Sequence, residues 1–158
     1  MTATPLGLET LTTISENGDD TTVTANHVEV IETVISSLEQ DDSAMVSHSD
    51  QGTLWKFKYG SVGVFVQLTG SSDADILTVW SSVLSLPAKN EPQLMRHLLE
   101  MNCSETFEAC FGILGNKVVV LASRPLADIS PGEISRLMTI VATIADDNDE
   151  ALQAEYGA

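Results

Sequence analysis

The sequence predicts an α+β domain of two layers, in which an antiparallel five-stranded sheet is flanked by helices. Three observations lead to this fold class. Some segments have apolar residues at helical spacing, others alternate as strands do, and the alternating segments are clustered in the sequence. The expected order is α-β-β-β-α-β-β-α, which argues against a parallel, doubly wound sheet.

The chain of 158 residues is expected to form one domain. Residues 1–25 are rich in Thr with few apolar positions, and we expect a mobile N-terminal tail there. Residues 26–145 form the predicted domain, and residues 146–158 an acidic C-terminal helix end and tail.

The first predicted helix has Asn26 as its N-cap. Its β-branched residues lower its intrinsic propensity, so we expect packing to hold it in place. The apolar stripe consists of Val28, Ile31, Val34, Ile35 and Leu38.

Three strands are predicted next, over residues 54–59, 62–68 and 76–86. The first two alternate clearly and form an antiparallel meander across a Gly60 turn. Side chains expected on one face are Trp55, Phe57, Tyr59, Val62, Val64, Val66 and Leu68.

A second helix over residues 89–102 is predicted to be capped by Asn90 and to bury Leu94, Met95, Leu98 and Met101. Two further strands, 106–114 and 116–124, are joined by Gly115-Asn116, a dipeptide suited to a tight hairpin.

The third helix starts with the capping-box spacing of Ser130 and Glu133. Its predicted buried stripe is Ile134, Leu137, Met138, Val141, Ile144 and Ala145.

The net charge of -16 argues against nucleic acid and anionic membranes as partners, since both require Lys and Arg. We expect a cytoplasmic protein, because no membrane-length apolar run and no basic leader are present. Cys103 and Cys110 fit reduced thiols and match no zinc pattern.

The acidic run Asp146 to Glu150, DDNDE, fails the calcium-loop pattern. Counted from Asp146, the sixth residue is Ala151 where Gly is needed, and the twelfth is Gly157 where Glu is needed. We expect a solvated helix end that frays from about Asp146, because acidic residues there oppose the helix dipole. Weak divalent binding and contact with a basic partner stay open.

No catalytic constellation is recognisable. The three histidines lie on different elements, neither Cys has a nearby base, and no nucleophile elbow or phosphate-binding loop is present. We therefore expect no enzyme activity and no cofactor or metal.

The second face of the predicted sheet mixes polar and aromatic side chains. It is either an ordinary semi-polar surface or a groove or dimer face that takes an extended peptide. The two lysines would then contact an acidic peptide or its carboxylate end. The candidate partner-binding residues are Lys56, Lys58, Phe65, Gln67, Trp80 and Cys110, with Glu108 beside them.

The segments VIETVISSLEQ, GTLWKFKYGSVGVFVQL, LPAKNEPQLMRHLLEMN and SPGEISRLMTIVATIADDNDEAL resemble the YbjN-like family, which has the type III secretion chaperone-like fold. The resemblance spans roughly residues 26–155 and includes members from photosynthetic bacteria. It implies a small acidic protein, often a homodimer, that binds other proteins, and it raises carboxysome shell assembly as one role.

Two functional hypotheses remain. The first is a non-enzymatic, chaperone-like or adaptor module that binds a client peptide at the sheet face as a homodimer. The second is a regulatory domain that senses a small ligand or a divalent metal.

Overall fold

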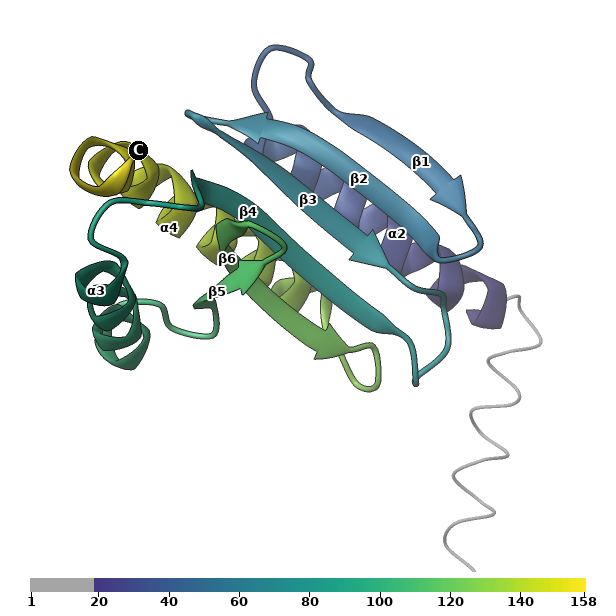
Figure 1. Ribbon diagram of the computed structural model, residues 1–158. Helices are drawn as coiled ribbons and strands as arrows, with labels where there is room; N and C mark the ends of the chain where they lie inside the picture. The colour runs from purple at the N-terminus through teal and green to yellow at the C-terminus, as the bar shows by residue number, and fades with distance from the viewer. Residues whose placement is uncertain (1–18) are drawn as a thin grey trace, which may run out of the picture.

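The computed structural model describes residues 19–158 (Figure 1). Residues 1–18 lie outside this part, and so does most of the predicted tail. The elements are α2 (Asp19–Leu38), β1 (Met45–Ser49), β2 (Gly52–Tyr59), β3 (Val62–Leu68), β4 (Ile76–Ser85), α3 (Glu91–Ser104), β5 (Cys110–Leu114), β6 (Lys117–Pro125) and α4 (Pro131–Tyr156).

The sheet is antiparallel and has six strands in the order β1-β2-β3-β4-β6-β5. The predictions of five strands and of three strands before the second helix are therefore wrong. The additional strand is β1, which pairs with β2 from Met45↔Lys56 to Ser49↔Gly52. Every residue of β1 is exposed, so the strand is held by main-chain pairing and has no buried face that alternation could reveal.

The two layers are the sheet and the helices α2 and α4, which lie together behind one sheet face (Figure 1). The third helix, α3, lies beside the edge strand β5. No described helix covers the opposite face of the sheet, which we call the bare face.

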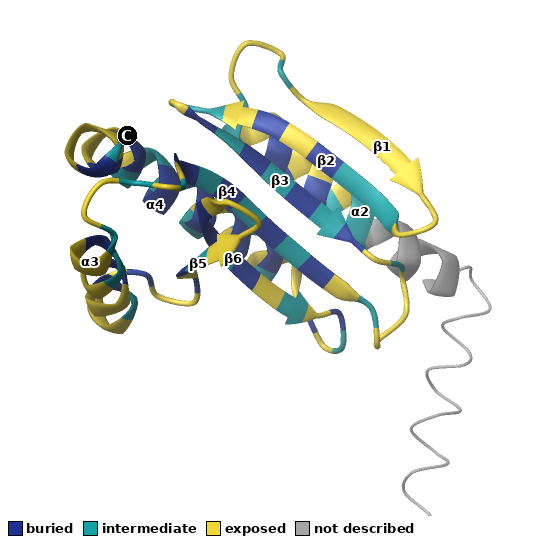
Figure 2. Ribbon diagram, in the orientation of Figure 1, coloured by how far each residue is buried: buried dark blue, intermediate teal, exposed yellow. Residues whose placement is uncertain are grey.

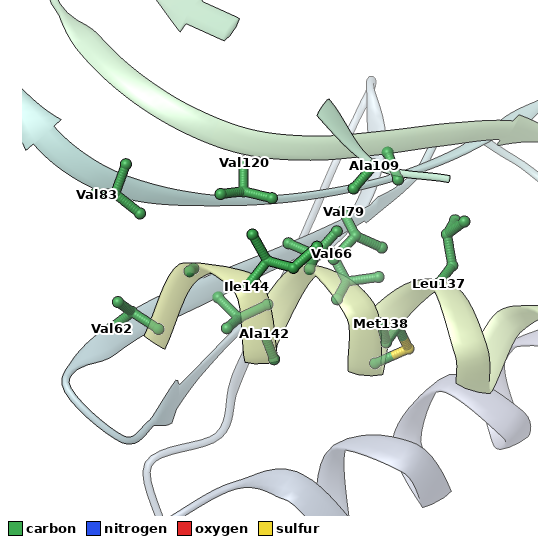
Figure 3. Close-up of a cluster of buried hydrophobic side chains, with 14 of the residues drawn as sticks. Val62, Val66, Val79, Val83, Ala109, Val120, Leu137, Met138, Ala142 and Ile144 are labelled. Atoms are coloured by element: carbon green, nitrogen blue, oxygen red, sulfur yellow. The ribbon is translucent and has the colours of Figure 1, made fainter. Parts of the chain in front are cut away.

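The core lies between the sheet and the two helices. Figure 3 shows Val66 and Val79 of the sheet and Met138 and Ala142 of α4 in one cluster of hydrophobic side chains, and all four are fully buried. The predicted alternation of β3 is confirmed, since Val62 and every second residue to Leu68 are buried. Fully burying a side chain of this size contributes about 1.5–3 kcal/mol, so this layer provides most of the stabilisation.

Two predicted helix starts need correction. Helix α2 begins at Asp19 rather than after Asn26, which lies inside the helix. Asn90 precedes α3 as predicted, but it is left-handed (φ 49°) and its side chain makes no capping bond. Glu91 accepts a hydrogen bond from the Ala88 N–H at 2.8 Å instead.

Helix α4 has the predicted capping box, with Ser130 Oγ accepting from the Glu133 N–H and Glu133 accepting from the Ser130 N–H. The predicted fraying from Asp146 is wrong, because α4 continues to Tyr156. Asp149, Leu152 and Tyr156 are 4%, 4% and 3% exposed, so the buried stripe passes directly through the acidic run. Packing thereby outweighs the unfavourable helix dipole.

The acidic run also holds the turn between β2 and β3. The Ser61 N–H donates to Asp146 Oδ1 at 2.9 Å, and the Ser61 hydroxyl donates to Asp149 Oδ1 at 2.8 Å. Gly60 (φ 56°) lies against this contact, where a Cβ atom would come within 2.1 Å of Asp146 Oδ1. Asp146 and Asp149, which the sequence predicted to lie in a solvated helix end, thus stabilise the fold.

Candidate functional site

A single row of paired residues crosses the bare face. The register pairs Lys56 with Phe65, Phe65 with Trp80, Trp80 with Leu121, and Leu121 with Cys110. Four of the predicted binding residues therefore lie in one line over β2, β3, β4 and β5.

Aromatic stacking organises the middle of this row. The rings of Phe65 and Trp80 are stacked with centroids 5.3 Å apart and an interplanar angle of 11°. Lys56 Nζ lies 5.4 Å from the Phe65 centroid, within the range of a cation–π contact. Such contacts add about 0.5–1.5 kcal/mol per aromatic pair and about 0.5–1 kcal/mol per exposed cation, so the row is an ordered platform.

An apolar depression of about 340 Å³ adjoins Trp80. Val119 in its wall is 2% exposed although it lies outside the hydrophobic core cluster. Gly112 keeps the depression open, since a Cβ atom there would come within 3.1 Å of the Leu121 side chain. The lining residues are Gln67, Thr78, Trp80, Gly112, Ile113, Leu114, Val119 and Leu121.

The other candidate residues have different positions. Gln67 pairs with Thr78 one row away and lines the depression. Lys58 lies apart from the row, with its Nζ 3.3 Å from Asp41 Oδ2 in an exposed ion pair. Glu108 lies in the turn before β5 and pairs with Arg136, whose hydrogen bond holds the pKa of Glu108 below its usual value.

Lys56 is the only basic residue of the row, and it forms no ion pair within residues 19–158. Its ammonium group is exposed beside an aromatic stack and an apolar depression. This arrangement can accept an extended segment that places apolar side chains in the depression and a carboxylate near Lys56.

Sequence reasoning missed the residues that β5 and β6 contribute to the depression. The run Val118 to Leu121 could have revealed part of this lining, because four consecutive apolar residues in a strand indicate burial on both faces. The exposed pair Ile113 and Leu114 carried no such signal, since a hairpin edge is often apolar on one side only.

Metal and membrane features are absent from the described part of the chain. Residues 19–158 contain no group of three or more His, Cys, Asp or Glu side chains placed to hold a metal ion. Among these residues there is also no helix with the length and apolarity that crossing a membrane requires.

The fold, an antiparallel sheet with two helices on one face and a bare second face, is similar to that of two solved chaperone-like proteins. The crystal structure of the ExsC–ExsE complex superposes with a TM-score of 0.59 at 16% identity, covering 82% of this chain and 95% of that chain. The structure of the HopA1–SchA chaperone–effector complex gives 0.54 at 12% identity, covering 78% and 93%.

The chain belongs to the YbjN family. The family model, described as "Putative bacterial sensory transduction regulator", matches residues 27–154. This range contains all strands of the sheet and the acidic run of α4. None of the curated proteins matches the chain.

Proposed function

We propose that this protein is a non-enzymatic binding module, chaperone-like or adaptor, that holds an extended client segment on its bare face. The observation that carries the proposal is the apolar depression next to the stacked Phe65 and Trp80. Two fold relatives are solved as complexes with a protein partner, which supports a protein client.

The client would lie across the row, with one large apolar side chain in the depression. Burying such a side chain contributes about 1.5–3 kcal/mol, which makes Trp80 and Leu121 the main anchors. Lys56 would contact an acidic side chain or the carboxylate end of the client. Lys58 and Cys110 lie at the periphery of this contact.

Affinity purification from the native cell, followed by mass spectrometry, tests the proposal. Wild-type protein is compared with a Trp80→Ala/Leu121→Ala variant and with Ile76→Ala, which removes an exposed apolar side chain of β4 outside the depression. We expect one dominant client that the double variant loses and the control retains. Equal recovery by all three proteins would refute a client site in the depression.

The resemblance to proteins of photosynthetic bacteria makes a carboxysome shell protein one client to look for among the captured proteins. A cytoplasmic location follows from the same proposal, since shell assembly takes place there.

A homodimer is part of the proposal, and the surface that α3 and β5 share is our candidate interface. Leu99 is 66% exposed and Ile113 57% exposed, and both line a hollow of about 290 Å³ between these elements. In Figure 2 this side of the molecule is largely exposed. Light scattering should give twice the monomer mass, and Leu99→Asp should halve it.

The description of the family favours a second candidate, a regulatory domain that senses a small ligand or a divalent metal. Thermal-shift measurements with calcium, magnesium and nucleotides separate the two, because a ligand of the folded state raises the melting temperature by mass action. A large shift with one of these would favour the sensor.

A further inference from the structure

Another hollow lies on the helix side of the sheet, between the end of α3 and α4. Its volume is about 320 Å³. Met101, Ile140 and Ile144 give it an apolar floor, while Phe107, Glu105 and Asp147 stand at its rim. We call it the α3–α4 cleft, and it shares no residue with the depression of the bare face.

Phe107 is unusual in two respects. It is 74% exposed, and its φ of 54° places it in the left-handed region that favours glycine. The turn that contains it is closed by the Ala109 N–H donating to the Thr106 carbonyl at 2.9 Å. Neither burial nor backbone preference explains a phenylalanine here, and residues held in such conformations cluster at binding sites.

The charged residues that line the cleft are of one sign. Glu105 and Asp147 line it, and neither forms an ion pair within residues 19–158. No Lys, Arg or His is among the lining residues. The cleft therefore combines an aromatic ring, an aliphatic floor and two carboxylates without a counter-charge.

We propose that the α3–α4 cleft binds an arginine side chain of a protein partner. A guanidinium group is planar, so it stacks on an aromatic ring and donates hydrogen bonds to carboxylates at the same time. Its aliphatic stem would pack on Ile140 and Ile144. A lysine ammonium is a strongly hydrated point charge and meets these requirements less well.

The arginine must come from another molecule. All three arginines of this chain are already paired, Arg96 with Glu100, Arg124 with Glu133 and Arg136 with Glu108. Residues 1–18 contain no Lys or Arg, so the N-terminal segment offers no basic side chain either. A net charge of -16 adds a long-range attraction for basic segments.

The test is an NMR titration of the full ¹⁵N-labelled chain with acetyl-Gly-Arg-Leu-Gly-amide, with lysine and citrulline peptides as counterparts. Citrulline is the neutral isostere of arginine. We expect saturable shifts of the Phe107 and Asp147 amides, strongest with arginine and absent with citrulline. Shifts of equal size with citrulline, shifts elsewhere only, or no saturation would overturn the proposal.

Two variants and one control locate the binding. Phe107→Gly suits the local backbone and should weaken binding of the arginine peptide about threefold, the contribution of an exposed cation–π contact. Glu105→Gln/Asp147→Asn should weaken it about tenfold, as expected for two charged contacts. Glu29→Gln/Asp73→Asn changes the net charge equally at exposed positions outside the cleft and should leave binding unchanged.

Three results would contradict the assignment. If the control variant weakened peptide binding equally, the effect would come from the net charge of the chain rather than from the cleft. Calcium that shifts the same amides at lower concentration than the peptide would make the cleft a cation site. Loss of self-association in Glu105→Gln/Asp147→Asn would make a second copy the occupant. None of these outcomes depends on whether the bare face binds a client.

Discussion

The depression of the bare face and the α3–α4 cleft have nearly the same volume and opposite chemistry. The depression on the bare face, about 340 Å³, contains no charged residue, and its lining residue Gln67 lies on the strand next to that of Lys56. The α3–α4 cleft, about 320 Å³, has carboxylates of Glu105 and Asp147 at its rim. Although the chain is strongly acidic, no acidic residue lines the depression, whereas two carboxylates without an ion-pair partner line the cleft.

This difference separates two contributions to recognition. An apolar depression provides affinity through burial and is nearly insensitive to salt, whereas exposed carboxylates provide orientation and an association rate that salt screens. A client that used both surfaces would carry an apolar anchor and a basic residue on different segments. Perturbing one surface should leave binding at the other intact.

The largest expected effect comes from removing the apolar anchors of the depression, which should weaken client binding and leave the cleft intact. We expect Trp80→Ala/Leu121→Ala to weaken client binding about thirtyfold or more, since buried anchors of this kind contribute about 2 kcal/mol or more. The Phe107 and Asp147 shifts with the arginine peptide should persist unchanged. Isothermal titration calorimetry with the captured client, alongside the NMR titration, measures both. Loss of both activities together would mean that the two surfaces are coupled.

The next largest expected effect is on stability and concerns the acidic run, in which Asp149 is buried and structural while Asp147 lines the cleft. Asp149 is 4% exposed and held by Ser61, whereas Asp147 faces the cleft. Ser61→Ala leaves a buried carboxylate without this donor and should lower the free energy of unfolding by about 2–3 kcal/mol. Urea denaturation measures the change.

Two controls define that result. Ser71→Ala, at an exposed turn serine, should have no effect on stability. The double variant Ser61→Ala/Asp149→Ala should be more stable than Ser61→Ala alone, because the unpaired charge is then absent. If Ser61→Ala were as stable as wild type, Asp149 would not depend on the turn for its hydrogen bond.

A smaller effect on stability, of opposite sign at the two sites, is expected from replacing Phe107 of the cleft and Phe65 of the bare face. Phe107→Gly should raise the free energy of unfolding by about 1 kcal/mol, because it removes a left-handed backbone cost and loses little burial. Phe65→Ala should instead lower it, since the Trp80 stack is lost. Thermal and urea unfolding of both variants give the signs, and destabilisation by Phe107→Gly would show that this ring does pack.

Features that depend on local chemistry could be predicted from the sequence. The capping box at Ser130 and Glu133 and the buried alternation of β3 follow from neighbours a few residues apart, and the structure confirms them. The family and its fold were also recognisable from such core patterns. The partner-binding role of Lys56, Phe65 and Trp80 stays a prediction, although their alignment in one row is now visible.

Features that need distant residues together could not be predicted. The depression joins Trp80 to Gly112 and Leu121, which only the β4-β6-β5 order brings side by side. The role of Asp149 depended on a serine in a turn far away in the sequence. A left-handed Phe107 has no sequence signal at all, because turn rules expect Gly or Asn at such a position.

The smallest expected effect is the response to acid, which should act on the helix side before the bare face. Hydrogen bonds from Arg136 and Arg124 hold the pKa values of Glu108 and Glu133 below their usual range. The unfolded state therefore takes up these protons more readily, so the stability that the two pairs contribute is present above pH of about 4.3 and is lost as the pH falls through the lower folded values.

Glu108 directly follows Phe107, so acid should loosen the turn at the cleft. The row from Lys56 to Cys110 and the lining of the depression contain no carboxylate and should be unaffected. Amide shifts of Phe107 and Trp80, followed from pH 6 downward, measure the order of events. Glu108→Gln should reduce the response at Phe107, beside which Glu105 and Asp147 also lie, and keep the one at Ser130, where Glu133 titrates. A simultaneous response at Trp80 and Phe107 would mean that acid acts through global unfolding rather than through these two ion pairs.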